Sequence, residues 1–299
     1  MTWISLSLLS AAFLGLYDVA KKAAVHNNAV PPVLLSNVVT AALLWFPLMV
    51  LSKVQPEWLP TPLRVTALEP YQHALLMGKS ILVGASWTCA LFALKQLPIA
   101  IATTIRATSP VWTVIIAILA FGERPSSNQL LAISVILVAF FAFSRVGKQE
   151  GITFHRDRWV ALMAVATVLG SFSALYDKYL LQTVGITPAC VQAWFSVYLV
   201  PVMCPLWLRW ILKERQVKPF QWRLAIPLIA IALLIADFAY FTAISYEGAL
   251  ISIISPIRRT SIVIPFVVGV LWFGERNWRP KLACIMAILA GVYWLSLRS

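Results

Sequence analysis

Two apolar segments each carry arginine among hydroxyl side chains at a spacing of three residues. The stripes consist of Thr103, Arg106 and Ser109 and of Ser255, Arg258 with the adjacent Arg259, and Ser261. Residues three apart share one face of an α-helix. A guanidinium presents a fork of N–H donors that matches the oxygens of a carboxylate or phosphate. We therefore predict that these seven residues bind a substrate that bears an anionic group.

Both arginine stripes lie deep in segments that otherwise predict membrane spans. At 1.5 Å per residue, Arg106 is about 12 Å along its segment and Arg258 about 13.5 Å along its own. A charge near the bilayer centre costs at least about 2.5–3.5 kcal/mol, so both side chains must face a water-filled cavity or a charged partner. Pro110 and Pro256 adjoin the stripes and each removes a backbone donor, which favours bent helices that line such a cavity.

Three carboxylates at similar depth offer another interpretation, in which the arginines form buried ion pairs that only fix helix packing. These carboxylates are Asp18, Asp177 and Asp237. The cations expected at membrane depth are Lys79, Arg106, Lys178, Arg258 and Arg259. Because five cations exceed three anions, the cavity interpretation is favoured.

The same three aspartates are candidates for ion coupling. A carboxylate removed from water can exchange protons near neutral pH. For Asp18 and Asp177, the alternative is a structural ion pair with Lys21, Lys22 or Lys178.

Composition places the chain in a membrane. Of its 299 residues, 61% are hydrophobic and 12% charged, and the mean hydropathy is +0.84. Apolar runs of about 20 residues predict transmembrane helices. Ten such helices are expected near 3–25, 30–52, 72–95, 98–121, 127–144, 158–182, 187–210, 222–246, 249–273 and 278–297. The net charge of +13 lies mostly in short loops, which favours a membrane surface over a nucleic acid as the neighbour.

The chain is predicted to be an internal duplication. The repeated pieces are LYD at 16–18 and 175–177 and FGER at 121–124 and 273–276. A shift of 152 positions, from 99 to 251, also aligns Arg106 with Arg258. Five helices per copy place the second copy in the membrane upside down, an architecture found in secondary transporters. The expected organisation is a repeat at 1–145, a loop at 146–157 and a second repeat at 158–299.

Two five-helix halves, each with a hydroxyl-rich fourth helix running into FGER, resemble EamA-type members of the drug/metabolite transporter superfamily. The resemblance covers nearly the whole chain. It implies ten helices around a central cavity that opens alternately to each side, with Arg106, Arg258 and their neighbours lining it. Basic residues on the fourth and ninth helices are also similar in position to those of sugar-phosphate carriers in that superfamily.

The function expected is secondary transport of a small polar metabolite. The alternatives are export of amino acids or cationic drugs and, from another class, a membrane-embedded lipid enzyme or a non-transporting scaffold. No nucleotide-binding loop or metal-ligand spacing occurs, so we expect no catalytic residue, cofactor or metal.

The expected location is the cell (inner) membrane, where the protein contacts lipids and not nucleic acid, in a form compatible with a monomer. The orientation stays open. The positive-inside rule predicts external termini, whereas the resemblance implies cytoplasmic ones.

Overall fold

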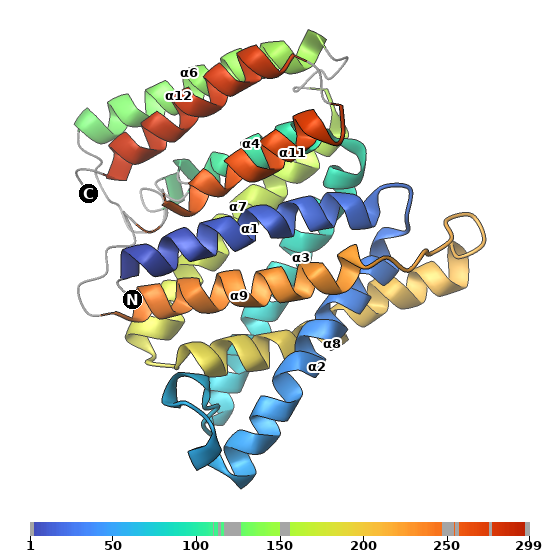
Figure 1. The fold of residues 1–299 in the computed structure, drawn as a ribbon, viewed down its shortest axis with the longest axis vertical. Coiled ribbons are helices and arrows are strands. Elements are labelled where there is room, and N and C mark those ends of the chain that lie inside the picture. The colour runs from blue at the N-terminus through green and yellow to red at the C-terminus, as the bar shows by residue number, and fades with distance from the viewer. Residues whose placement is uncertain are drawn as a thin grey trace.

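The computed structural model describes residues 3–109, 111–112, 115–116, 127–149, 156–246, 254, 257–274 and 277–296, which fold into ten α-helices (Figure 1). The helices are α1 (Trp3–Val25), α2 (Val30–Val54), α3 (Pro70–Gln96), α4 (Ile99–Ala107), α6 (Ser127–Gln149), α7 (Arg158–Lys178), α8 (Pro188–Lys213), α9 (Ala225–Ser245), α11 (Val263–Leu271) and α12 (Trp278–Ser296). The all-α membrane fold predicted from the sequence is confirmed.

Helix starts coincide with prolines and polar caps. The predicted ranges agree with the described helices to within about five residues, except that 98–121 and 249–273 were expected as continuous helices and are interrupted. Helices α2, α3 and α8 each have proline in the first two positions, where a missing N–H costs nothing. The Asp157 carboxylate accepts the amide of Trp159 at 2.7 Å and so caps α7. Among the described residues, six helices are long and apolar enough to cross a membrane, and α6 contains a shorter apolar stretch, Leu130–Phe143.

Regular α-helix is interrupted beside both arginine stripes. Helix α4 stops at Ala107, and the Thr108 amide then bonds the carbonyl of Ile105 at 3.1 Å. In the second repeat a 3₁₀ turn, Thr260–Ile262, follows Arg259 and precedes α11. Short 3₁₀ segments inside helices often mark hinges. The prolines expected to bend these helices, Pro110 and Pro256, lie outside the described residues.

The helix contacts keep the same pattern when each helix is replaced by its counterpart in the other repeat. Helix α1 packs along α9, and the counterparts of these helices, α7 and α3, pack along each other. Helices α2 and α8 are counterparts that contact each other, as are α6 and α12. Helix α4 contacts α11, and the two belong to the predicted segments 98–121 and 249–273. Figure 1 shows α6 with α12 at one edge of the molecule, α4 with α11 next to them, and α2 with α8 at the opposite edge. The inverted-repeat architecture is therefore visible in the packing, while the repeat boundaries at 145 and 158 stay a prediction.

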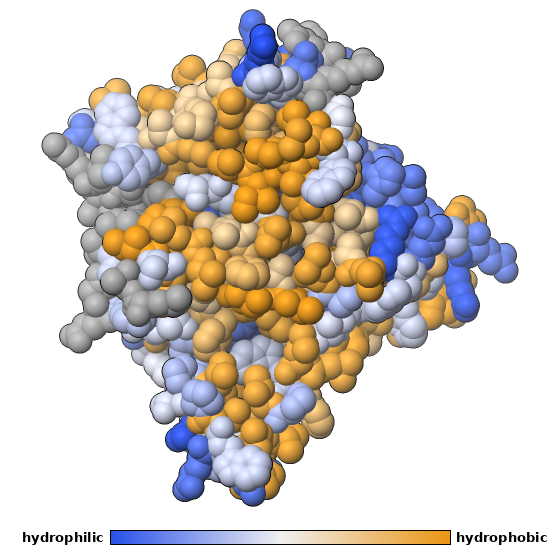
Figure 2. All heavy atoms as spheres, viewed as in Figure 1, coloured by the Kyte–Doolittle hydropathy of each residue, from blue (hydrophilic) through white to orange (hydrophobic). Residues whose placement is uncertain are grey.

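The outer surface is suited to lipid. Large apolar side chains such as Leu43, Phe46 and Val138 are exposed on the helices. Figure 2 shows hydrophobic residues over a broad area in the middle of the face in view, with hydrophilic residues gathered toward its edges. Acyl chains of the lipid would contact this apolar surface, whereas polar groups lie in the protein interior or at the ends of the helices.

Candidate functional site

The first ion pair of the site joins α1 to α4 through Asp18 and Arg106. Asp18 is buried, and its Oδ1 accepts a hydrogen bond from Nη1 of Arg106, close to the end of α4. The Lys21 ammonium, one turn further along α1, lies 2.7 Å from the same oxygen and 4.0 Å from the ring centre of Tyr17. One carboxylate therefore faces two cations.

The second ion pair joins Arg258, from the second arginine stripe, to Asp237 on α9. Nη2 of Arg258 donates to Oδ1 of Asp237 at 2.9 Å, and its guanidinium lies 3.8 Å from the ring centre of Tyr240. Asp237 and Tyr240 are three residues apart on α9 and so share a face. The Asp237 side chain is 18% exposed, against 7% for Asp18. Asp237 is therefore the more accessible of these two carboxylates.

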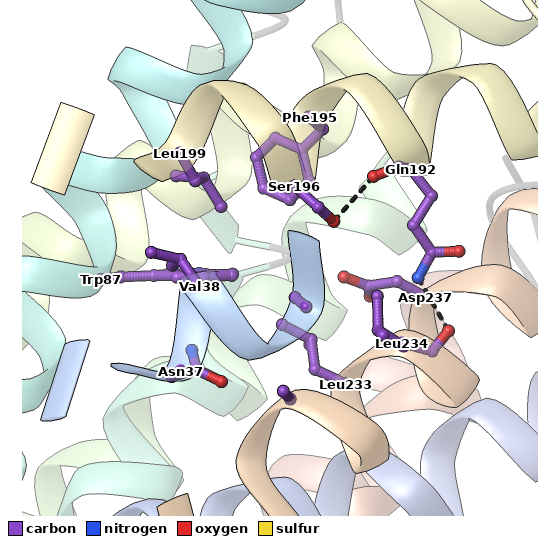
Figure 3. A pocket seen from close by; sticks show the side chains of 12 residues that line it. Asn37, Val38, Trp87, Gln192, Phe195, Ser196, Leu199, Leu233, Leu234 and Asp237 are labelled. Carbon is purple, nitrogen blue, oxygen red and sulfur yellow. Dashed lines mark hydrogen bonds between the residues drawn. The ribbon is translucent and has the colours of Figure 1, made fainter. Parts of the chain in front are cut away.

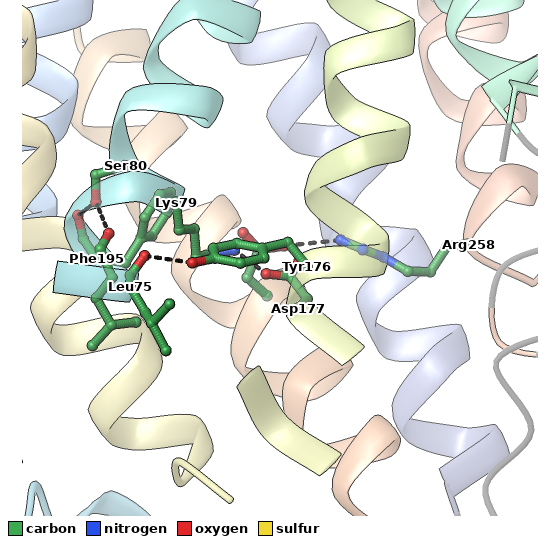
Figure 4. A network of polar contacts seen from close by, with 9 residues as sticks. Leu75, Lys79, Ser80, Tyr176, Asp177, Phe195 and Arg258 are labelled. Atoms are coloured by element: carbon green, nitrogen blue, oxygen red, sulfur yellow. Dashed lines mark hydrogen bonds and ion pairs between the residues drawn. The ribbon is translucent and has the colours of Figure 1, made fainter. Parts of the chain in front are cut away.

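The third pair crosses between the repeats. Nζ of Lys79 on α3 donates to Oδ1 of Asp177 near the end of α7, and both side chains are buried. The same ammonium lies 4.8 Å from the ring centre of Phe195 on α8 and 5.3 Å from that of Phe241 on α9. Figure 4 shows Lys79, Asp177 and Arg258 following one another across the bundle. A π-helical turn, Tyr179–Thr183, follows directly after α7, and such turns are frequent at functional sites.

Arg259 differs from the other arginines because no described carboxylate pairs with it. Its Nη1 reaches the backbone carbonyl of Arg106 at 3.5 Å, which brings the two arginine stripes together. Within the described part of the chain, Nε of Arg259 and Nε of Arg258 have no hydrogen-bond partner. The cluster thus keeps unused N–H donors and excess positive charge.

The described contacts of the predicted hydroxyl residues are with the backbone. The Thr103 hydroxyl donates to its own helix, at the carbonyl of Ile99 2.8 Å away. The carbonyl of Ser109 accepts from the Ser171 hydroxyl at 3.1 Å, which links the end of the first stripe to α7. Ser261 is buried where the 3₁₀ turn meets α1. Ser255 lies outside the described residues.

The structure changes the assignment of two lysines, Lys178 and Lys21. Lys178, expected at membrane depth, is exposed where α7 ends. Lys21 is instead buried and shares Asp18 with Arg106. Lys22, another alternative partner for Asp18, donates to the carbonyls of Leu94 and Leu97 at 2.9 and 2.5 Å. Arg106 and Arg258 thus each pair with a carboxylate, and among the described side chains of the cluster the cations still outnumber the carboxylates.

A small cavity adjoins the second pair (Figure 3). Its volume is about 10 Å³, roughly room for one water, and its walls come from α2, α3, α8 and α9. Asn37, Trp87, Gln192 and Asp237 are among its lining residues. The Asn37 and Gln192 side-chain oxygens have no partner among the described atoms, so polar groups lie available beside Asp237.

Three contributors were not predicted as site residues: Lys79, the partner of Asp177, Lys21, named only as an alternative partner of Asp18, and Tyr240, the ring beneath Arg258. For Lys79, 98 residues from Asp177, the sequence gives no local signal. Lys21 and Tyr240 differ in this respect. Both carry a local signal. Lys21 follows Asp18 by three residues, and Tyr240 follows Asp237 by three, the spacing at which helical side chains meet. The spacing of three does not tell which other helix packs against these residues.

Comparisons with known proteins concern the family and the fold of the chain. The model of the EamA-like transporter family matches residues 1–145, the first predicted repeat. One solved structure, described only as the crystal structure of a protein, aligns with 98% of this chain and 96% of its own, with a TM-score of 0.59 and 18% identity. At that identity the likeness concerns the fold alone. No curated protein matches the chain.

Proposed function

Because the chain belongs to the EamA-like transporter family of the drug/metabolite transporter superfamily, and so is a multi-pass membrane transporter, we propose that it carries a small polar solute bearing a carboxylate or phosphate group. The proposed mode is secondary transport by alternating access. Arg106, Arg258 and Arg259 recognise the anionic group, while Asp18, Asp177 and Asp237 are the candidates for coupling to protons or another ion.

The observation that carries the proposal is the guanidinium of Arg259. A charge removed from water without a partner is strongly unfavourable, and an interior that keeps one must compensate for it. Arg106 and Arg258 have described counter-charges in Asp18 and Asp237, whereas Arg259 has none among the described residues. An anionic solute would supply the missing charge at the point where the two stripes meet.

Hydrogen-bond geometry supports an oxygen-rich anion in particular. Carboxylate and phosphate groups accept two or more N–H donors at once. Nε of Arg258 and Nε of Arg259 are both unpartnered within the described chain. Two neighbouring arginines with unused Nε donors match such a group better than a single lysine would.

Alternating access needs segments that can change shape, and both stripes adjoin one. Helix α4 ends one residue after Arg106, and the 3₁₀ turn Thr260–Ile262 begins one residue after Arg259. A change of backbone angles there would move the arginines without unfolding a long helix. The arginines could then stay in contact with the solute while the site opens first to one side of the membrane and then to the other.

A second candidate substrate, a zwitterion such as an amino acid, is favoured by the position of Asp237. Its carboxylate is partly exposed and lies beside the small cavity. An ammonium group could replace Arg258 as the partner of Asp237, and the released Arg258 would then bind the carboxylate of the same molecule.

Purified protein tests the substrate class through ligand stabilisation. A solute that binds the folded state raises the melting temperature by mass action. Organic carboxylates and phosphate esters are expected to raise it, and cationic drugs are not. Arg259→Gln should abolish the rise, and Lys178→Gln, which removes an exposed charge, should retain it.

The same variants are then assayed for uptake in proteoliposomes. Selective stabilisation by cations, or full anion binding by Arg259→Gln, would contradict the anionic class. Stabilisation by amino acids alone would favour the zwitterion.

A further inference from the structure

The link between α8 and α9 and the last turns of α8 form a second basic region, far from the arginine cluster in sequence. We call residues 209–224 the basic link. It contains five cations and one acid, Arg209, Lys213, Arg215, Lys218, Arg223 and Glu214. Four of the cations, all except Arg223, are exposed, and Glu214 is already paired with Lys218 at 2.8 Å. The basic link therefore presents a strong positive charge outward.

Helix lengths place the basic link at the membrane surface. Helix α8 runs for 26 residues, which at 1.5 Å per residue is about 39 Å. The hydrocarbon core is only about 30 Å thick, so about two turns of such a helix extend beyond it, and the charged carboxy-terminal turns are the ones that prefer the headgroup region. Arg209 and Lys213 belong to these turns. Helix α9 begins again at Ala225, so the chain returns into the membrane directly afterwards.

Large apolar side chains are exposed within the same short stretch. Leu212, Val217, Trp222 and Leu224 are 79%, 81%, 60% and 84% exposed. In water such a set is unfavourable, but beside acyl chains it is stabilising, and tryptophan prefers the membrane interface. Figure 2 shows the hydrophilic residues of this end gathered at the right edge, where Figure 1 places the link that projects beyond the bundle.

The basic link is held in place and does not trail freely. Asn28, in the turn between α1 and α2, donates to the carbonyl of Gln221 at 2.7 Å and accepts its amide at 2.9 Å. Nη1 of Arg223 donates to the carbonyls of Ala23 and His26 at 2.7 and 2.6 Å. The indole N–H of Trp210 bonds the carbonyl of Lys218 at 2.9 Å. The exposed cations are thereby presented from a fixed backbone.

We propose that the basic link is a binding site for the headgroups of anionic membrane lipids. Arg209, Lys213, Arg215 and Lys218 bind the phosphate groups, and the exposed apolar side chains enter the adjoining acyl region. Clusters of four or more cations next to a membrane span have this affinity, and each one contributes separately to it. The site lies apart from the arginine cluster and does not depend on which solute is carried.

The test is lipid binding by the full chain in an uncharged detergent, measured by native mass spectrometry during titration with phosphatidylglycerol or phosphatidylcholine. Wild-type protein should retain phosphatidylglycerol in preference, and added salt should weaken this binding. The variant R209Q/K213Q/R215Q/K218Q should bind phosphatidylglycerol about tenfold or more weakly, since four surface cations are lost. Its circular dichroism should be unchanged, because the replaced side chains are exposed.

A matched pair of single variants separates this site from general charge effects. Lys213→Gln should lower the affinity for phosphatidylglycerol, whereas Lys53→Gln, exposed at the end of α2, should not. Equal retention of both lipids by wild type, wild-type binding by the fourfold variant, or an equal loss with Lys53→Gln would each overturn the proposal. So would displacement of the lipid by inorganic phosphate at comparable concentration, because the site would then recognise free phosphate.

Discussion

Asp18 and Asp177 close the same tripeptide in the two repeats, yet they pair with cations from differently placed helices. Asp18 binds Arg106 on α4 of its own repeat, and Asp177 binds Lys79 on α3 of the other repeat. Arg258, the counterpart of Arg106, turns to Asp237. Sequence repetition is therefore not matched by repetition of the charge contacts.

Breaking the buried pair across the repeats should be strongly destabilising. Lys79→Met leaves the Asp177 carboxylate buried without its cation, which we expect to cost about 3–5 kcal/mol in the free energy of unfolding. The double variant Lys79→Met, Asp177→Leu should recover much of that loss because no lone charge remains. Chemical denaturation in detergent measures both. A double variant that is less stable than Lys79→Met would contradict this account.

Arg258→Lys should weaken solute binding while preserving the fold. Lysine can keep the ion pair with Asp237, but it loses the planar fork and the close stacking on Tyr240. We expect an apparent affinity about tenfold lower, the equivalent of about 1.4 kcal/mol for one charge-assisted hydrogen bond. Uptake in proteoliposomes provides the measurement, with Arg215→Lys on the exposed link as the control. Unchanged uptake would remove Arg258 from the binding site.

Asp18→Asn should destabilise the protein more than Asp237→Asn does. Asp18 is shared by Arg106 and Lys21, so its loss leaves two cations unpaired, whereas the loss of Asp237 strands Arg258 alone. Asp18 is also the more buried of the two. We expect a cost of about 3–5 kcal/mol for Asp18→Asn, and less for Asp237→Asn. Thermal unfolding of the two proteins side by side decides the order, and the reverse order would mean that Lys21 finds another partner.

Gly15 and Gly78 form a matched pair for testing helix packing. A Cβ at Gly15 would lie 2.7 Å from Cβ of Ile264 and 3.0 Å from the carbonyl of Ser261, whereas at Gly78 its nearest neighbour would be the Tyr176 hydroxyl at 3.9 Å. Gly15→Ala should therefore destabilise by about 1–3 kcal/mol through overpacking. Gly78→Ala should be neutral or stabilise by up to about 1 kcal/mol, because alanine favours the helix. Melting temperatures check both, and a harmless Gly15→Ala would show that α11 can shift away from α1.

The positions of the helices could be predicted from the sequence, because apolar runs in a bilayer allow few other structures. The predicted range 3–25 is the observed α1, and 188–213 differs from the predicted 187–210 by a few residues. The repeat also predicted that Arg106 and Arg258 belong to one site, and the contact between Arg259 and Arg106 supports this.

The sequence offered alternative partners for the charges, Lys21 for Asp18 among them, but could not select the pairs that form. Asp18 and Arg106 are 88 residues apart, and three carboxylates with several cations allow many pairings of similar energy. Which pairs form depends on how α1, α4 and α9 pack, and this is set by side-chain shapes along whole helices. Lys178 shows why the position of a residue along a span does not fix its burial. A lysine at the end of a span can turn its side chain outward.

The exchange of helices between the repeats limits how the transporter can move. The packing of α1 on α9, α3 on α7, α2 on α8 and α6 on α12 always joins a helix of the first repeat to one of the second. If the amino-terminal and carboxy-terminal halves rocked as two separate bodies, each of these interfaces would have to slide or part. For the proposed alternating access we therefore expect the bodies that move to be mixed units, each built from helices of both halves, with a boundary that differs from the boundary between the repeats.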